Sequence, residues 1–165
     1  MGRAEKKLKR QEANANKKQL PVASGRQGGK HVGSAADAPE SIDRLPFSWS
    51  AADVDHDFDG AWDWNLQPKE TADLLRLLEE TSRLTWREVK DLKFNSKSRT
   101  RQRHHDQSID TICPEARQRL GELHLDLDTV FRLRHGNLIR VWGYLQGSVF
   151  KIVWYDRHHK VCPGE

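Results

Sequence analysis

The spacing of hydrophobic positions differs along this chain, and each spacing predicts one kind of element. Between residues 68 and 84, apolar side chains recur every three and four positions, which is typical of the buried face of an amphipathic helix. The residues on this face are Leu74, Leu75, Leu77, Leu78 and Thr81. Pro68 stands at the first helical position, where its missing N–H group is not needed.

Two further helices are expected from their start signals. Thr85 and Glu88 have the spacing of a capping box, so a short helix is predicted to begin after Thr85. Pro114 predicts the start of another helix, which ends near His124.

The last third of the chain is rich in β-branched and aromatic residues. It predicts three strands at about Asp128–Arg134, Leu138–Leu145 and Ser148–Asp156. Together with the helices before them, these strands predict an α+β fold. We expect residues 41–165 to form a single α+β domain, with two to three helices followed by a three-stranded antiparallel meander.

Turn chemistry predicts how these strands pair. A turn at Gln146-Gly147 gives the pairs Gly143 with Phe150, Val141 with Ile152 and Ile139 with Trp154. A three-residue loop, His135-Gly136-Asn137, gives the pairs Phe131 with Val141 and Leu133 with Ile139. It also sets Arg132 opposite Arg140, a like-charge pair that weakens the sheet unless an anion binds there.

One face of this predicted sheet combines basic and aromatic side chains, namely Arg132, Arg134, Arg140, Lys151, Trp142, Tyr144 and Tyr155. Such a face suits nucleic acid, because cations bind phosphate and rings stack on unpaired bases. The alternative is that a helix covers this face and Trp142 packs in the core.

Polar and basic residues dominate two further segments. Residues 1–40 hold nine Lys and Arg against four Asp and Glu, with few apolar side chains, so we expect a disordered basic arm. The segment Lys93–His105 is also polar and basic, and it is expected to be a mobile loop. Its residues predicted to contact nucleic acid are Arg101, Arg103, His104 and His105.

The segment after the last strand contains candidates for proton transfer. Asp156, His158 and His159 are the candidate catalytic residues, because imidazole exchanges protons near neutral pH. If strand alternation continues past Asp156, His159 lies on the polar face and His158 on the buried one. Both histidines are equally compatible with solvated loop positions.

No metal or cofactor is expected. Asp55, Asp57 and Asp59 have the spacing of the first half of a calcium-binding loop, but the twelfth position is Leu66 where a glutamate is required. Zinc would need Cys113 and Cys162 together with histidines, and no Cys-x-x-Cys pair is present. Two cysteines in a chain of this size favour a reducing compartment, and no long apolar run is present, so a cytoplasmic protein without membrane contact is expected.

The stretch from Phe131 to Pro163 resembles a group of small bacterial proteins. Their last strand reads Trp-x-Asp-x-x-His-x-hydrophobic-Tyr-Pro, and here Cys162 replaces the tyrosine. This resemblance extends over about residues 44–163. Helices followed by a meander also resemble the RelE/ParE toxin superfamily, whose RelE-like members cleave messenger RNA on the ribosome. That resemblance implies that Arg132, Arg134, Arg140 and His159 occupy positions of the phosphate clamp and the acid/base groups.

Two functions from different classes are compatible with these features. The first is an RNA-directed protein, in particular a RelE-like endoribonuclease of a toxin–antitoxin system, with RNA or the ribosome and an antitoxin protein as partners. The second is a non-catalytic module that binds a protein or nucleic acid. The sequence alone does not decide whether the protein is an enzyme.

Overall fold

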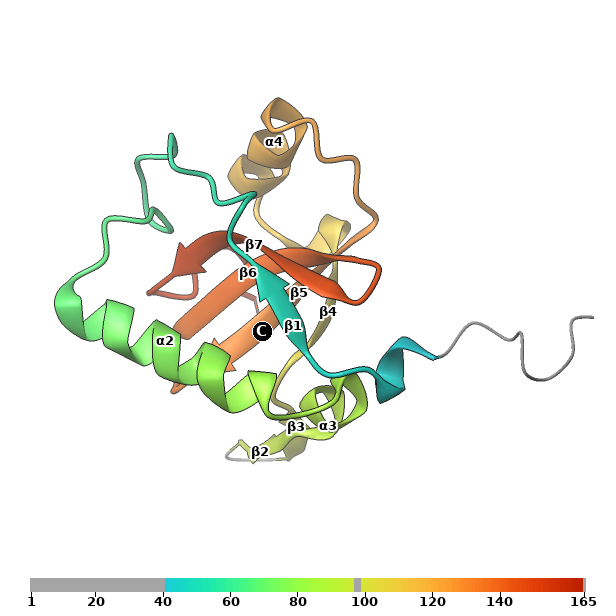
Figure 1. Cartoon of the computed structure of the whole chain (residues 1–165). Coiled ribbons are helices and arrows are strands. Elements are labelled where there is room, and N and C mark those ends of the chain that lie inside the picture. Colours follow the sequence, from blue (N-terminus) through green and yellow to red (C-terminus); the bar gives the residue numbers. More distant parts are fainter. Residues whose placement is uncertain (1–40, 97–98, 165) are drawn as a thin grey trace, which may run out of the picture. The chain divides into compact units, whose positions relative to one another are not determined.

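The computed structural model describes residues 41–96 and 99–164, and these form an α+β fold (Figure 1). The predicted disordered arm at residues 1–40 lies outside the described residues. In the described ranges, no helix has both the length and the apolar character needed to cross a membrane.

The main sheet has five strands in the order β1-β7-β6-β5-β4. Their bounds are β1 Ser48–Ser50, β4 His105–Ser108, β5 Thr129–His135, β6 Ile139–Gln146 and β7 Val149–Asp156. The sheet is mixed, because β1 is parallel to β7 while the other pairs are antiparallel. The three predicted strands are present as β5, β6 and β7, but β4 and β1 extend the sheet on both sides. A RelE-like three-stranded meander is therefore not confirmed.

The three predicted α-helices are confirmed as α2 Pro68–Ser82, α3 Trp86–Asp91 and α4 Pro114–Glu122, and two short 3-10 helices, η1 Ile42–Arg44 and η2 Ile109–Thr111, accompany them. The capping box is present. The backbone N–H of Glu88 donates to Thr85 Oγ1 at 3.3 Å, and the N–H of Thr85 donates to Glu88 Oε2 at 2.7 Å. These two bonds satisfy backbone donors that the first helical turn leaves without partners.

The prediction of a mobile loop at Lys93–His105 is wrong for much of that segment. Strands β2 (Lys93–Asn95) and β3 (Thr100–Gln102) pair as a separate antiparallel hairpin, and β4 begins at His105. Backbone pairing forms these strands, while their side chains are nearly all polar. The sequence therefore lacks the hydrophobic alternation that would have predicted them.

Both faces of the main sheet are covered, and Figure 1 shows α2 and α4 on opposite sides of it. Leu77 of α2 and Trp86 and Val89 of α3 pack with one sheet face, which carries Phe131, Leu133, Val141, Phe150, Ile152 and Tyr155. Ala116 and Leu120 of α4 and Trp62 pack with the other, which carries Val130, Trp142, Val153 and Trp154.

The β5–β6 hairpin is shifted by two residues from the predicted register. Leu133 pairs with Val141, and the three-residue loop spans residues 136–138, with Gly136 at a φ of 59°. A shift of two leaves every side chain on its expected face. It changes the pairs, so that Arg134 lies opposite Arg140.

The β6–β7 hairpin turns at Gly147-Ser148, one residue later than predicted. Gly143 pairs with Ile152, whereas its neighbour Trp142 pairs with Trp154, so a bulge leaves one extra residue in β7. Trp154 therefore points to the α4 side, and the predicted pair of Trp154 with Ile139 is wrong. The sequence pattern carried no signal for this bulge.

Gly143 is required at the bulge. A Cβ atom there would lie 2.0 Å from the carbonyl oxygen of Lys151 and 2.7 Å from Phe150 Cε2. The predicted pair of Gly143 with Phe150 is wrong, because Phe150 pairs with Leu145, but the Phe150 ring still lies against Gly143.

We predict that Gly143→Ala destabilises the fold by about 1–3 kcal/mol, because a backbone carbonyl occupies the space of the added methyl group. Gly121→Ala is the matched control. It lies in α4 with no atom within 4 Å of the added carbon, so it should raise stability by up to about 1 kcal/mol through helix propensity. Urea denaturation measures both changes. Equal effects of the two substitutions would show that the bulge tolerates a side chain.

Candidate functional site

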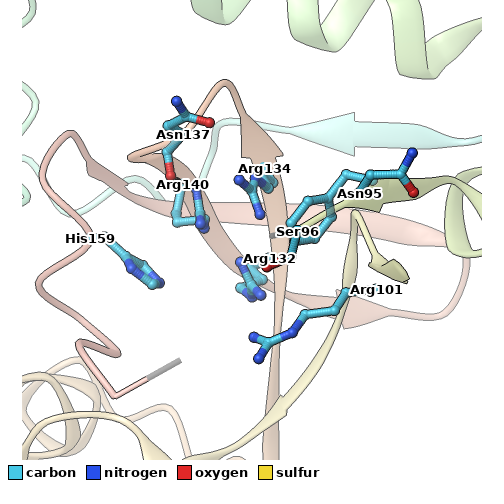
Figure 2. A pocket seen from close by; sticks show the side chains of 9 residues that line it. Asn95, Ser96, Arg101, Arg132, Arg134, Asn137, Arg140 and His159 are labelled. Carbon is cyan, nitrogen blue, oxygen red and sulfur yellow. Dashed lines mark hydrogen bonds between the residues drawn. The ribbon is translucent and has the colours of Figure 1, made fainter. Parts of the chain in front are cut away.

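A pocket of about 410 Å³ lies where three separate parts of the chain meet (Figure 2). We call it the arginine pocket. Its lining residues come from the β2–β3 hairpin, from β5, β6 and their loop, and from the turn after β7. They are Phe94, Asn95, Ser96, Arg101, Arg132, Arg134, Asn137, Arg140 and His159. Four guanidinium groups around one concave space make this the strongest candidate site for an anion.

Strand alternation places three of these arginines on one sheet face. Arg132 and Arg134 alternate with Leu133, which packs on the α2 side, so both arginines point to the α4 side. Arg140 stands opposite Arg134 and points the same way. Arg132 and Arg140 are each only 3% exposed, so they form the floor of the pocket.

Uncharged groups orient two of the guanidinium groups. Arg140 Nη1 donates to the carbonyl oxygens of Asn137 at 3.2 Å and Ile139 at 2.9 Å. Arg134 Nε donates to the carbonyl oxygen of Gly136 at 2.8 Å, and its Cζ lies 3.6 Å from the centre of the Phe94 ring. These contacts hold the two guanidinium groups in place.

His105 orients Arg132. Its Nδ1 lies 2.8 Å from the carbonyl oxygen of Asp106, and its Nε2 lies 2.6 Å from Arg132 Nη2. Because the carbonyl oxygen can only accept, Nδ1 carries the hydrogen and Nε2 accepts from the guanidinium group. In this arrangement His105 is a neutral positioning residue.

His104 is buried next to the backbone of Arg134 and does not line the pocket. It is 1% exposed, and its Nδ1 accepts a hydrogen bond of 3.0 Å from the backbone N–H of Arg134. Burial, together with the smaller effect of positive charges such as those of Arg103 and Arg132, lowers its pKa from 6.5 to about 3. The imidazole is therefore neutral, and the direction of these electrostatic effects indicates a positive potential around it.

Asp156 shapes the turn that follows β7. The residue is fully buried, and its carboxylate accepts from the backbone N–H groups of His158, Lys160 and Val161 and from Trp142 Nε1 at 2.8–3.3 Å. These four bonds give Asp156 a structural role. The expectation that it moves protons has no support in this geometry.

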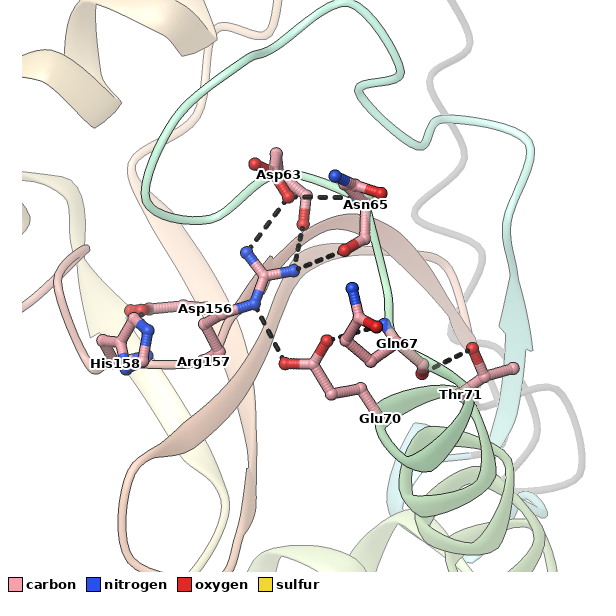
Figure 3. Close-up of polar contacts among 8 residues, drawn as sticks. All are labelled: Asp63, Asn65, Gln67, Glu70, Thr71, Asp156, Arg157 and His158. Carbon is pink, nitrogen blue, oxygen red and sulfur yellow. Dashed lines mark hydrogen bonds and ion pairs between the residues drawn. The ribbon is translucent and has the colours of Figure 1, made fainter.

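The turn separates the two candidate histidines. His159 lines the arginine pocket, whereas His158 is exposed and does not (Figures 2 and 3). His159 adopts a left-handed backbone conformation with a φ of 57°. The predicted difference between the histidines assumed continued strand alternation, but β7 ends at Asp156 and the turn determines their directions instead.

Arg157 anchors this turn to distant parts of the fold (Figure 3). Its Nε donates to Glu70 Oε1 and its Nη1 to Asp63 Oδ1, both at 3.0 Å. Burial raises the pKa of Asp63, but hydrogen bonds from Asn65 and Arg157 outweigh it and lower the pKa below its ordinary value. This positioning role could not be predicted from the sequence, because the partners of Arg157 lie 87 and 94 residues away in the chain.

Several residues predicted to contact nucleic acid lie elsewhere. Trp142 is fully buried on the α4 side, so its predicted stacking on a base is wrong. Tyr144 donates to Asp53 Oδ2 at 3.2 Å, and Lys151 forms an ion pair with the same oxygen at 3.2 Å. Arg103 is not among the lining residues, and its Nε donates to the carbonyl oxygen of Arg134 at 3.4 Å.

Four neutral residues that line the arginine pocket were not predicted from the sequence. Phe94, Asn95 and Ser96 belong to the segment expected to be a loop, and Asn137 belongs to the β5–β6 connection. Their types are common in surface turns, so only the position of the hairpin could have revealed them.

Asp55, the first residue of the calcium-like motif, is buried in a different set of contacts. Its two carboxylate oxygens accept from Arg119 at 2.7 and 2.8 Å, and Oδ2 also accepts from Trp154 Nε1 at 3.0 Å. Burial alone would raise the pKa of Asp55, but these bonds lower it below its ordinary value. The bidentate pair connects α4 to the segment before α2.

His104 predicts how stability changes in acid. Its folded pKa of about 3 lies below 6.5, so the unfolded chain binds the proton more tightly. Its contribution to stability is complete above about pH 6.5 and is lost as the pH falls toward 3. His104→Asn keeps an acceptor near the Nδ1 position and removes the titrating ring, so it should flatten this dependence.

Urea denaturation between about pH 4 and pH 7 measures the free energy of unfolding at each pH. His158→Asn is the control, because His158 is exposed, and it should keep the wild-type dependence. Identical pH dependence for wild type and His104→Asn would contradict the assignment.

Comparison with known proteins gives no family for this chain. A scan of protein-family profiles, a search of curated proteins and a search of solved structures all find no match. The function proposed below therefore rests on the geometry of the site and on the residues quoted above.

Proposed function

We propose that this protein binds RNA, and that the arginine pocket holds a phosphate group of its backbone. The observation that carries the proposal is that Arg132, Arg134 and Arg140 of the β5–β6 hairpin and Arg101 of the separate β2–β3 hairpin converge on one pocket. Neighbouring arginines on an exposed helix can be solvated independently, whereas two of these four are almost fully buried. An anion bound there interacts with groups that are already oriented.

Phosphate matches these donors better than a single carboxylate does. A guanidinium group is planar and donates two parallel hydrogen bonds to adjacent phosphate oxygens. A phosphodiester presents its anionic oxygens at the surface of the backbone, where donors from several directions can reach them. Arg101 on the β2–β3 hairpin and Arg140 on β6 supply such donors from different walls of the pocket (Figure 2).

The neutral lining residues favour a single strand. Asn95, Ser96 and Asn137 offer side-chain donors and acceptors beside the arginines. The base edges of an unpaired strand can reach such groups, whereas those in the deep groove of an RNA duplex cannot. Sequence-specific recognition of RNA usually targets unpaired segments for this reason.

For this function we predict that Arg101→Ala and Arg140→Ala each weaken binding of a single-stranded RNA and reduce its dependence on salt. Each lost phosphate contact lowers the slope of log K against log salt by about 0.7 for a single strand. Arg117→Ala is the charge-matched control, because Arg117 is exposed on α4 and does not line the pocket. Fluorescence anisotropy titrations at several salt concentrations measure the slopes. Slopes that fall equally for all three variants would indicate nonspecific charge attraction.

Cleavage of the bound RNA is a second candidate function, favoured by the position of His159 on the wall of the same pocket. In this proposal the arginines bind the scissile phosphate. His159 takes the proton from the 2′-hydroxyl as its oxygen attacks phosphorus, or gives a proton to the departing 5′-oxygen. The arginines stabilise the negative charge that develops on the phosphate oxygens. A RelE-like toxin, acting on ribosome-bound messenger RNA and blocked by an antitoxin protein, is the biological form of this proposal.

For catalysis we predict that His159→Asn lowers the single-turnover rate of RNA cleavage by a factor of about 10² to 10⁴, since it removes a proton-transfer group. Asparagine tolerates the left-handed backbone conformation of this position, so the turn should keep its shape. His158→Asn is the matched control and should retain activity. RNA incubated with and without ribosomes is the assay. RNA binding without cleavage by the wild-type protein would instead support the non-catalytic binding module.

A further inference from the structure

A second basic pocket of about 400 Å³ adjoins the arginine pocket. Its lining residues are Arg99, Thr100, Arg101, Gln102, His105 and Arg132. Arg101 and Arg132 line both pockets, so the two spaces meet at these side chains. The second pocket adds Arg99 as a cation of its own, together with two polar side chains from β3.

Arg132 can serve both pockets because its position is fixed. The residue is 3% exposed, and its Nη2 is held by His105 Nε2 at 2.6 Å. The positive charge of a guanidinium group is spread over one plane, so Arg132, which lines both pockets, attracts anions in each of them. Arg101 faces it from β3, on a different wall (Figure 2). The boundary between the pockets is therefore cationic.

We propose that the two pockets are consecutive phosphate subsites, and that the ligand is an oligonucleotide with a phosphate on each side of one nucleoside. This inference rests on the proposed function and deepens it by naming the minimum ligand. One phosphate occupies the arginine pocket beside Arg140 and His159. The next occupies the second pocket beside Arg99, and Arg101 and Arg132 contact both.

Because the two pockets are separate, they fit a ligand with two phosphates that are spaced apart better than they fit a diphosphate. The phosphates of pyrophosphate share one bridging oxygen, so both would lie close to the shared arginines. In an oligonucleotide a nucleoside separates consecutive phosphates, which lets each phosphate reach the cation at the far end of its own pocket. Arg140 lines only the arginine pocket and Arg99 lines only the second pocket.

The test compares two dinucleotides on the full-length protein by isothermal titration calorimetry. UpU carries one phosphate, and 5′-phosphorylated pUpU carries two. We expect pUpU to bind on the order of tenfold more tightly, with a salt slope larger by about 0.7. Arg99→Ala should remove this advantage and leave the affinity for UpU unchanged. Arg140→Ala should weaken both ligands, and the control Arg117→Ala should weaken neither.

Each other outcome contradicts a defined part of the proposal. Equal affinity of wild type for UpU and pUpU, or an equal loss of both in Arg99→Ala, would overturn the second subsite and leave RNA binding intact. If pyrophosphate competes as well as pUpU does, the ligand is a diphosphate, and the proposal of two phosphates separated by a nucleoside is wrong. If neither UpU nor pUpU binds, both the proposed function and this inference are wrong. Arg99 is exposed, so its substitution should not affect folding, and a thermal melt checks this.

Discussion

The bulge opposite Gly143 is the constraint on which the C-terminal half of this fold depends. It inserts one residue into β7, so that Trp154 and Asp156 point to the α4 side of the sheet. Asp156 is thereby buried next to Trp142, where its carboxylate binds three backbone N–H groups of the following turn. That turn brings His159 to the arginines. Without the bulge, Asp156 would point toward α2 and the turn would lose the acceptor that organises it.

Concentrating arginines at one end of a sheet opposes stability, and the structure contains several features that accommodate it. Arg134 lies directly opposite Arg140, a pairing that is unfavourable for like charges. Backbone carbonyl groups and the Phe94 ring orient these two side chains. His104, which accepts a hydrogen bond from the backbone N–H of Arg134, is neutral because burial and the surrounding positive charges lower its pKa. Departures from local sequence rules of this kind are characteristic of functional sites.

The elements that could be predicted from the sequence are those with a local signal. These signals are the capping box at Thr85, the apolar stripe of α2 and the alternation in β5. Each is formed by residues that lie close together in the sequence. The face to which Arg132 and Arg140 point was also predictable, because a register shift of two residues preserves the side-chain alternation. The β2–β3 hairpin could not be predicted from the sequence, because its pairing depends on backbone hydrogen bonds between mostly polar residues.

The sequence by itself therefore determined the α+β class, the three helices, the three long strands and the face that carries the arginines. It also contained the two other segments that line the pocket beside these arginines, one around Arg101 and one around His159. Only the tertiary structure decided that these segments meet, that Trp142 is buried beneath α4, and that Asp156 closes a turn. The physical reason is that hydrophobic periodicity acts over a few residues, whereas the bulge, the second covered sheet face and the anchoring of Arg157 depend on contacts between residues far apart in the chain.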